Sequence, residues 1–423
     1  MVKKLSASAL ACALVFFCAP FAPSQENKSE NSGFLINYEE IMEDDISMIN
    51  LPARHERRLA QNETIRNHDG CLAFYSDFKD FVQEKTGLRY GVDISYTAQR
   101  VAPGGKNTAV QGIYYPYAVW NIFNDTKFGS GQIDFNYNLV RYWGLEAGEL
   151  DSRVGVASAI NDYPDRQDVF SQLSYTHTMP GSLAWLSLTV GQFPLYNFDG
   201  TSYDSNQQTG LINYALSQNA SASYPSAGLG AYLSAALSKE ITLSGGYQSA
   251  SNISGSRIKF KEAFDGDYTG FASLNYSDES GQYGLMGYYQ PSTEEQKGCS
   301  WGWSFNAEEN LGGKWSAFGR ANGSVNNITP VKQSYVLGLS YRNPLDRNPL
   351  DAITVAAAYN RLSAKAADAP YVRTGETVFE AQWVWGLGKC LTITPDVQFY
   401  PEAGLNAERE WITVAGLRTT FMF

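Results

Sequence analysis

The chain has 423 residues, of which 43% are hydrophobic and 14% aromatic, and it carries a formal net charge of −11. A helical membrane protein needs about 20 consecutive apolar residues for each span, and no such run occurs after residue 25. The acidic balance argues against nucleic acid as a partner.

Residues 1–24 have the pattern of a signal peptide. Two lysines precede a largely apolar stretch from Leu5 to Phe21, and small residues follow before Gln25. A membrane anchor is the alternative, and Pro20 together with the serines inside the stretch argues against it. We therefore expect export from the cytoplasm.

Residues 25–86 are predicted to form a partly helical extension, either periplasmic or associated with a lumen. The first part is polar and rich in charged residues. A clearer helix follows, ended by Gly87, with apolar residues mostly on one face at Leu72, Phe74, Phe78, Phe81 and Val82. That face must pack on something, and the candidate is the wall of a barrel.

Residues 87–423 are predicted to form a transmembrane antiparallel β-barrel, so the chain is all-β apart from its helical extension. The hydrophobic pattern has a period of two, beginning with Leu88, Tyr90, Val92, Ile94 and Tyr96. Short turn-like breaks alternate with longer polar connections. We count roughly 15 to 17 strand candidates, and single-chain bacterial barrels close with even numbers, so about sixteen strands are expected. Short turns would face the periplasm and long loops the outside.

The apolar faces of these strands favour a membrane over water. In a soluble protein they would need cover from helices or a second sheet, and no helical pattern long enough to supply it follows residue 87. Tryptophans and tyrosines gather near strand ends, as in the girdles of outer-membrane barrels. The chain also ends in Phe423, which resembles the signal read by the barrel-assembly machinery. A soluble β-helix or sandwich is the alternative, and no fixed repeat supports it.

Seven segments carry a family resemblance in their order and spacing: Phe170–His177, Leu186–Gln192, Phe198–Asp199, Gly210–Asn219, Glu376–Ala381, Thr394–Tyr400 and Gly416–Arg418. They resemble the carbohydrate-selective porins of the OprB family, from about residue 165 to the end. The resemblance implies an outer-membrane channel for passive diffusion of small sugars. One departure is that the family's Asp-Trp-Gly-Gly sequence before the first strand is replaced here by the residues from Tyr75 to Lys79.

A sugar channel needs inward-facing carboxylates, amides and guanidinium groups that exchange hydrogen bonds with hydroxyls, and aromatic faces for the sugar ring. Binding must stay weak so that the solute can leave. Strand parity directs nine such residues inward: Asp134, Asn136, Asn138, Glu308, Arg320, Glu380, Gln382, Asp396 and Gln398. A solvated wall without a selective role is the alternative for most of them.

The long connection from Phe193 to Ala227 is the stronger candidate for a constriction. It holds Asp199, Asp204 and Gln207 and then a short predicted helix at about residues 211–216. Asp162, Asp165 and Arg166, in the preceding connection, are expected at the same mouth. A calcium site at Asp199-Gly or Asp265-Gly-Asp267 is an alternative, but neither matches a twelve-residue calcium loop, so no metal is expected.

Two arginines are further candidates. Arg141 and Arg166 are predicted either to offer paired donors to sugar hydroxyls or to pair with carboxylates in the lumen.

Three other functions compete with a sugar channel. One is a general or weakly cation-selective porin, and another is a barrel blocked by the extension. The third, a barrel lipase, requires a nucleophile beside a base. The chain has only 3 histidines and no Gly-x-Ser-x-Gly element in a suitable context. We expect no enzymatic activity and no cofactor.

The expected partners are small sugars, outer-membrane lipids and lipopolysaccharide, the assembly machinery, and further copies in a homotrimer. The sequence leaves open which saccharide passes and the disulfide state of Cys71, Cys299 and Cys390.

Overall fold

The computed structural model of the chain describes nine stretches: residues 73–103, 107–199, 208–264, 266–278, 280–294, 296–348, 350–363, 373–388 and 390–423. The predicted signal peptide, the extension before residue 73, Cys71, Asp204 and Gln207 lie outside the described residues.

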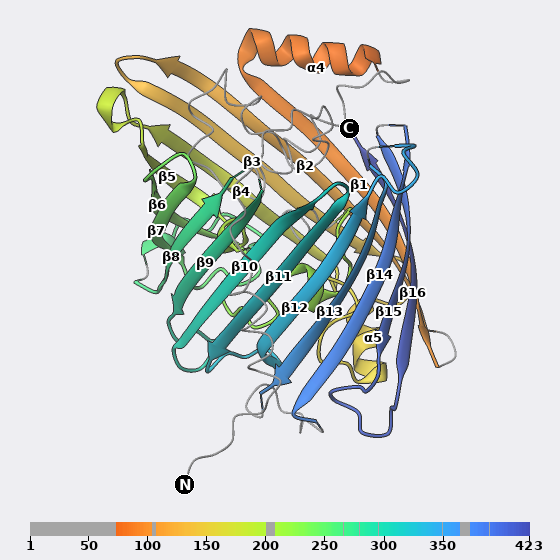
Figure 1. Cartoon of the computed structure of the whole chain (residues 1–423). Coiled ribbons are helices and arrows are strands. Elements are labelled where there is room, and N and C mark those ends of the chain that lie inside the picture. The colour runs from red at the N-terminus through yellow and green to blue at the C-terminus, as the bar shows by residue number, and fades with distance from the viewer. Residues whose placement is uncertain are drawn as a thin grey trace. The chain divides into compact units, whose positions relative to one another are not determined.

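Sixteen antiparallel strands form a closed barrel in which each strand pairs with its neighbours in sequence and β1 pairs with β16 (Figure 1). The prediction of an all-β antiparallel barrel of about sixteen strands is confirmed. The strands are β1 (Leu88–Ala102), β2 (Thr108–Asp125), β3 (Gly129–Tyr142), β4 (Gln167–Thr178), β5 (Leu186–Phe193), β6 (Gly228–Ala236), β7 (Ile241–Ser249), β8 (Tyr268–Ser277), β9 (Gly281–Gln290), β10 (Ser300–Gly312), β11 (Trp315–Val325), β12 (Val331–Arg342), β13 (Ala352–Leu362), β14 (Gly375–Leu387), β15 (Leu391–Tyr400) and β16 (Ile412–Met422).

The helices of the described residues are few and short. They are α4 (Ala73–Thr86), α5 (Ala147–Val154) and α7 (Tyr214–Ser217), with 3-10 turns η2 (Gly181–Leu183), η3 (Leu195–Phe198) and η4 (Glu262–Phe264). Among the described residues, no helix combines the length and the apolarity that crossing a membrane requires.

Burial in the barrel is the reverse of burial in a soluble protein. Along β1, the polar residues Asp93, Ser95 and Thr97 are buried on the inner face, while Tyr96 is exposed on the outer face. Large apolar side chains are exposed around the whole outer wall, including Leu233, Leu243, Leu274, Leu285, Leu337, Val355, Phe379 and Leu417. Because successive residues of a strand point to opposite faces, the period of two in the sequence produces this inversion directly.

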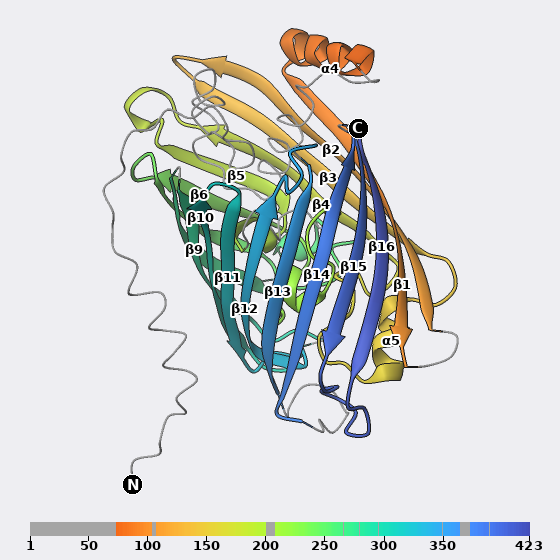
Figure 2. The ribbon, with the colours of Figure 1, turned by 45° about the vertical axis from the view of Figure 1, so that its right-hand side comes forward.

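Connections of two kinds alternate between the two ends of the barrel. Short turns join strands at the end that carries the C terminus, such as residues 313–314 between β10 and β11. Long connections lie at the other end, among them residues 143–166 and 194–227 (Figure 2). The alternation agrees with the order of short and long breaks in the sequence.

The predicted helix before the barrel is present as α4, but its apolar face does not pack on the wall. Phe74, Phe78 and Phe81 are exposed, whereas Lys79 on another side of the helix is buried. The helix is fixed at its end, since Trp120 donates from Nε1 to the carbonyl of Thr86 at 2.9 Å. This attachment limits how α4 can rotate about its axis. The side that faces β1 is therefore the one with Lys79 and not the one with the phenylalanines.

We expect Gly191→Ala to weaken the barrel. Gly191 has φ +134°, where a side chain is strained, and a Cβ atom there would overlap the carbonyl oxygen of Leu173 on β4. A loss of about 1–3 kcal/mol is expected, measured as a lower temperature for the loss of the compact band in heat-modifiability gels. Gly270→Ala, where a Cβ would meet nothing within 4 Å, is the control. Equal melting of both variants would contradict this account.

Candidate functional site

The inner wall is lined by polar side chains. The nine wall residues that strand parity directed inward are all buried on the inner face: Asp134, Asn136, Asn138, Glu308, Arg320, Glu380, Gln382, Asp396 and Gln398. Their role toward a solute stays a prediction.

The two predicted lining arginines lie in different surroundings. Arg141 sits on the outer face of β3, where its guanidinium pairs with Asp168 at 2.7 Å and both side chains are half-exposed. The expectation of a lumen position for Arg141 is therefore wrong, because it differs in parity from Asn138. Arg166 lies in the connection before β4 and pairs with Glu146 at 3.1 Å.

Two connections fold into the barrel and contact the wall. We call residues 143–166, which include α5, the first inward segment, and the described residues 194–199 and 208–227, which include η3 and α7, the second inward segment. Apolar side chains of both are fully buried, among them Leu150, Ile160, Leu211 and Leu216. They share one hydrophobic cluster with wall residues such as Val378. The predicted inward fold of the second segment is present, whereas the depth of the first segment was not anticipated.

Wall carboxylates hold the backbone of both inward segments. Glu376 of β14 accepts hydrogen bonds from the amides of Ala157 and Ser158 at 2.8 Å each. Glu380, four residues further along β14 on the same face, accepts from the amides of Ile212 and Asn213 at 2.7 and 2.9 Å. These bonds satisfy backbone donors that the segments leave without strand partners, so the two carboxylates fix where the chain lies inside the barrel.

Wall donors bind the carbonyls of the same segments. Gln99 of β1 and Gln398 of β15 both donate to the carbonyl of Ile160, at 2.8 and 2.9 Å. Arg418 of β16 donates to the carbonyl of Gly210 at 2.7 Å. The inward segments are thus bonded to three strands that meet at the closing seam of the barrel.

Asp199 anchors the second inward segment to the opposite wall. Its carboxylate accepts from Ser304 Oγ at 2.6 Å and Asn306 Nδ2 at 3.1 Å, both on β10. Within the segment it also accepts from Asn219 Nδ2 at 2.7 Å and the hydroxyl of Tyr224 at 2.9 Å. The predicted lining residue therefore has a structural role, with four donors around it.

Comparison with known proteins decides the family. The model of the carbohydrate-selective porins of the OprB family matches residues 153–423. The chain belongs to this family. It is also similar to curated porins of Chlamydia: Porin AaxA of Chlamydia abortus is 34% identical over 352 residues, covering 80% of this chain and 78% of the relative. Porin AaxA of Chlamydia trachomatis serovar D is 36% identical over 330 residues, covering 77% and 71%.

Solved OprB structures share the fold of this OprB-family barrel. The high-pH structure of Pseudomonas putida OprB aligns with a TM-score of 0.66 and 14% identity, covering 82% of this chain and 97% of that one. The low-pH structure aligns with a TM-score of 0.52 and 12% identity, covering 84% and 98%.

Burial raises the pKa of two groups in the inward segments of this OprB-family chain. Burial raises the pKa of Asp151 in α5 well above its usual range, although the amide of Ile160 donates to it at 3.0 Å. Burial and the neighbouring Asp199 carboxylate raise the pKa of Tyr224 well above its usual range. Tyr224 therefore remains a hydrogen-bond donor to Asp199.

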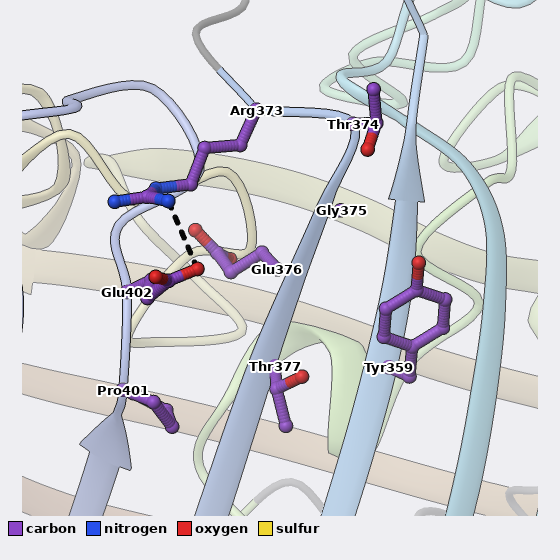
Figure 3. A pocket seen from close by; sticks show the side chains of 8 residues that line it. All are labelled: Tyr359, Arg373, Thr374, Gly375, Glu376, Thr377, Pro401 and Glu402. Carbon is purple, nitrogen blue, oxygen red and sulfur yellow. Dashed lines mark ion pairs between the residues drawn. The ribbon is translucent and has the colours of Figure 1, made fainter.

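A surface cavity of about 500 Å³ lies at the long-loop end of β13, β14 and β15. Figure 3 shows Arg373 reaching across it to Glu402, with an ion pair of 3.0 Å. The remaining lining residues are Tyr359, Thr374, Gly375, Glu376, Thr377 and Pro401. The cavity is separate from the nine polar residues of the inner wall.

We expect Glu380→Ala to loosen the second inward segment. The change removes the acceptor of two backbone amides, and a hydrogen bond to a charged group contributes about 1.5–3 kcal/mol. Amide hydrogen exchange of peptides within residues 208–220 should then accelerate about tenfold or more. Glu309→Ala removes an outward carboxylate on β10 that accepts from Tyr283, and it should leave those peptides unchanged. Slow exchange retained in Glu380→Ala would show that the carboxylate does not hold the segment.

Proposed function

We propose that the chain is a porin of the bacterial outer membrane through which small carbohydrates diffuse passively. The observation that carries the proposal is the inverted burial of the closed barrel, with an apolar outer wall and a polar inner wall. Without a lipid environment, the exposed leucines, valines and aromatic rings of the outer wall would contact water at a large free-energy cost. The family supports diffusion of a solute and names carbohydrates as its class.

The inner wall of β1, β2 and β3 offers the groups that a sugar needs. Buried tyrosines at 115 and 117 lie on β2, and their strand partners are Asp93 and Asn136. We call Asp93, Tyr115, Tyr117, Asp134 and Asn136 the tyrosine–carboxylate patch. Aromatic faces take the apolar side of a sugar ring, and carboxylate and amide oxygens accept from its hydroxyls. The patch supports weak, repeated sugar contacts of the kind that diffusion allows.

Sugar selectivity predicts unequal permeation of solutes of similar size. Proteoliposomes containing the mature chain should swell faster in glucose than in neutral amino acids of comparable size. Asn136→Leu, which removes an amide from the patch, should lower the rate of swelling in glucose several-fold. Phe135→Leu, at the neighbouring outward position, is the control and should leave that rate unchanged. Equal rates for all solutes would remove the sugar-selective proposal and leave a general porin.

The charge of the inner wall favours a second candidate, a weakly cation-selective porin. Among the described strand residues buried on the inner face, six are acidic and three are basic. The acidic ones are Asp93, Asp134, Glu308, Glu376, Glu380 and Asp396, and the basic ones are Arg89, Arg320 and Arg418. An excess of one sign along a confined path raises the local concentration of the opposite ion.

A reversal potential in a potassium chloride gradient tests this second candidate. We expect the permeability of K⁺ to exceed that of Cl⁻, and Asp93→Asn with Asp134→Asn to bring the ratio toward one. Asp168→Asn on the outer face controls for net charge. A wild-type ratio at or below one would rule out cation preference.

The proposal includes the expected partners and location. The outer wall would contact outer-membrane lipids and lipopolysaccharide, and its tryptophans would sit near the membrane surfaces. The rings of Phe421 and Phe423 at the end of the chain stack with centroids 6.3 Å apart, which supports recognition of the last strand by the barrel-assembly machinery. Export by the signal peptide at 1–24 and assembly as a homotrimer stay predictions.

A further inference from the structure

Helix α4 presents three chemically different sides. The side toward the barrel holds Lys79, which is buried with its ammonium 5.3 Å from the ring centroid of Tyr90 on β1 and 5.5 Å from that of Tyr75. This is a cation–π arrangement that places a charged residue, rather than an apolar one, against the wall.

A second side of α4 carries three exposed phenylalanines. Phe74, Phe78 and Phe81 are 86%, 48% and 56% exposed. At about 100° per residue, these positions and Lys85 form one stripe about 130° around the helix from Lys79. The stripe is apolar along about two turns, and Lys85 adds a positive charge one turn further on.

The third side of α4 is acidic. Asp77, Asp80 and Glu84 are all exposed, and by the same geometry they are centred about 100° around the helix from the phenylalanine stripe. A helix that is apolar along one flank and charged along the other has the division seen in helices that lie in a membrane interface.

The attachment of α4 joins it to the apolar outer surface of the barrel. The last carbonyl of the helix, that of Thr86, accepts from the indole of Trp120, and the carbonyl of Gly87 accepts from the amide of Asn121 at 2.9 Å. Trp120 and the following Ile122 and Phe123 are themselves exposed apolar residues at that end of β2. Figures 1 and 2 show α4 lying across the strand ends, at the barrel end that carries the C terminus.

We propose that α4 is an interfacial anchor whose phenylalanine stripe is immersed in the lipid leaflet next to the short-turn end of the barrel. The inference rests on the proposed membrane location, and it adds a lipid contact outside the strands. Three observations favour lipid as the occupant: the end of the helix is bonded to a strand end that carries exposed apolar residues, a different flank of the helix is charged and suited to water, and Lys85 is placed to meet lipid phosphates. The anchor would hold the start of β1 at a fixed depth in the membrane.

Spin-label accessibility tests the anchor in the mature chain, reconstituted in phosphatidylethanolamine–phosphatidylglycerol bilayers, with Cys71, Cys299 and Cys390 replaced by serine. Labels are attached at Phe78→Cys and Phe81→Cys, and at Asp77→Cys and Glu84→Cys as matched controls on the acidic flank. We expect the phenylalanine positions to show a several-fold higher ratio of oxygen to nickel-chelate accessibility than the acidic positions.

Two results would overturn the anchor. Strong nickel-chelate accessibility at both phenylalanine positions would place the stripe in water. Exclusion of both reagents would mean that protein covers it, either the chain before residue 73 or a second copy. A label at Leu285→Cys on the outer face of β9 separates this failure from failure of the membrane location itself. If Leu285→Cys is accessible to oxygen and the stripe is not, only the anchor is wrong; if Leu285→Cys is accessible to the nickel chelate, the proposed porin location is wrong.

Discussion

The antiparallel pairing of β1 with β16 is the constraint on which the rest of the structure depends. It runs from Asp93 opposite Met422 to Ala102 opposite Thr413 and closes the sheet on itself. None of the sixteen described strands then has an open edge, so the backbone donors and acceptors of the wall are satisfied within the sheet. A closed sheet is one of only two ways for a backbone to cross a lipid phase, and it leaves the side chains of the two faces free to specialise.

Polar side chains inside the barrel stabilise the protein itself, in addition to any contact with a solute. Glu376, Glu380 and Asp199 are carboxylates at positions that a solute-binding account would assign to the lumen, yet each accepts several hydrogen bonds from the protein. Since a connecting segment inside a barrel has no strand partners, its amides and carbonyls need such side chains. Many polar residues of the wall therefore have a structural role, because they hold the inward segments in place.

The fold was largely predictable from the sequence. Which inward-facing residues hydrogen-bond to the inward segments was not. A period of two specifies which residues face inward, and it placed Asp134, Glu308 and Glu380 correctly. The same period would have placed Arg141 on the outer face, because Arg141 is two residues from the outward-facing Leu139. Parity says nothing of contacts distant in sequence, such as Gln99 with Ile160. No sequence signal pointed to these contacts, since β1 and β15 carry one amide side chain each, Gln99 and Gln398.

The same limit applies to α4, where periodicity identified the helix but not what its apolar side contacts. Attachment of Thr86 to Trp120 and burial of Lys79 are tertiary facts that turn the phenylalanines away from β1.

The bonds from the inward segments to the last strands have a consequence for biogenesis. Gly210 and Gln208 belong to the first half of the chain, but Arg418 and Thr420, which donate to their carbonyls, arrive only with the final strand. A chain truncated before β16 would lose the seam and the internal scaffold together. The bonds that hold the second inward segment to β16 thus form in the same step that closes the barrel, so an incomplete polypeptide has neither a closed sheet nor a fully bonded inward segment.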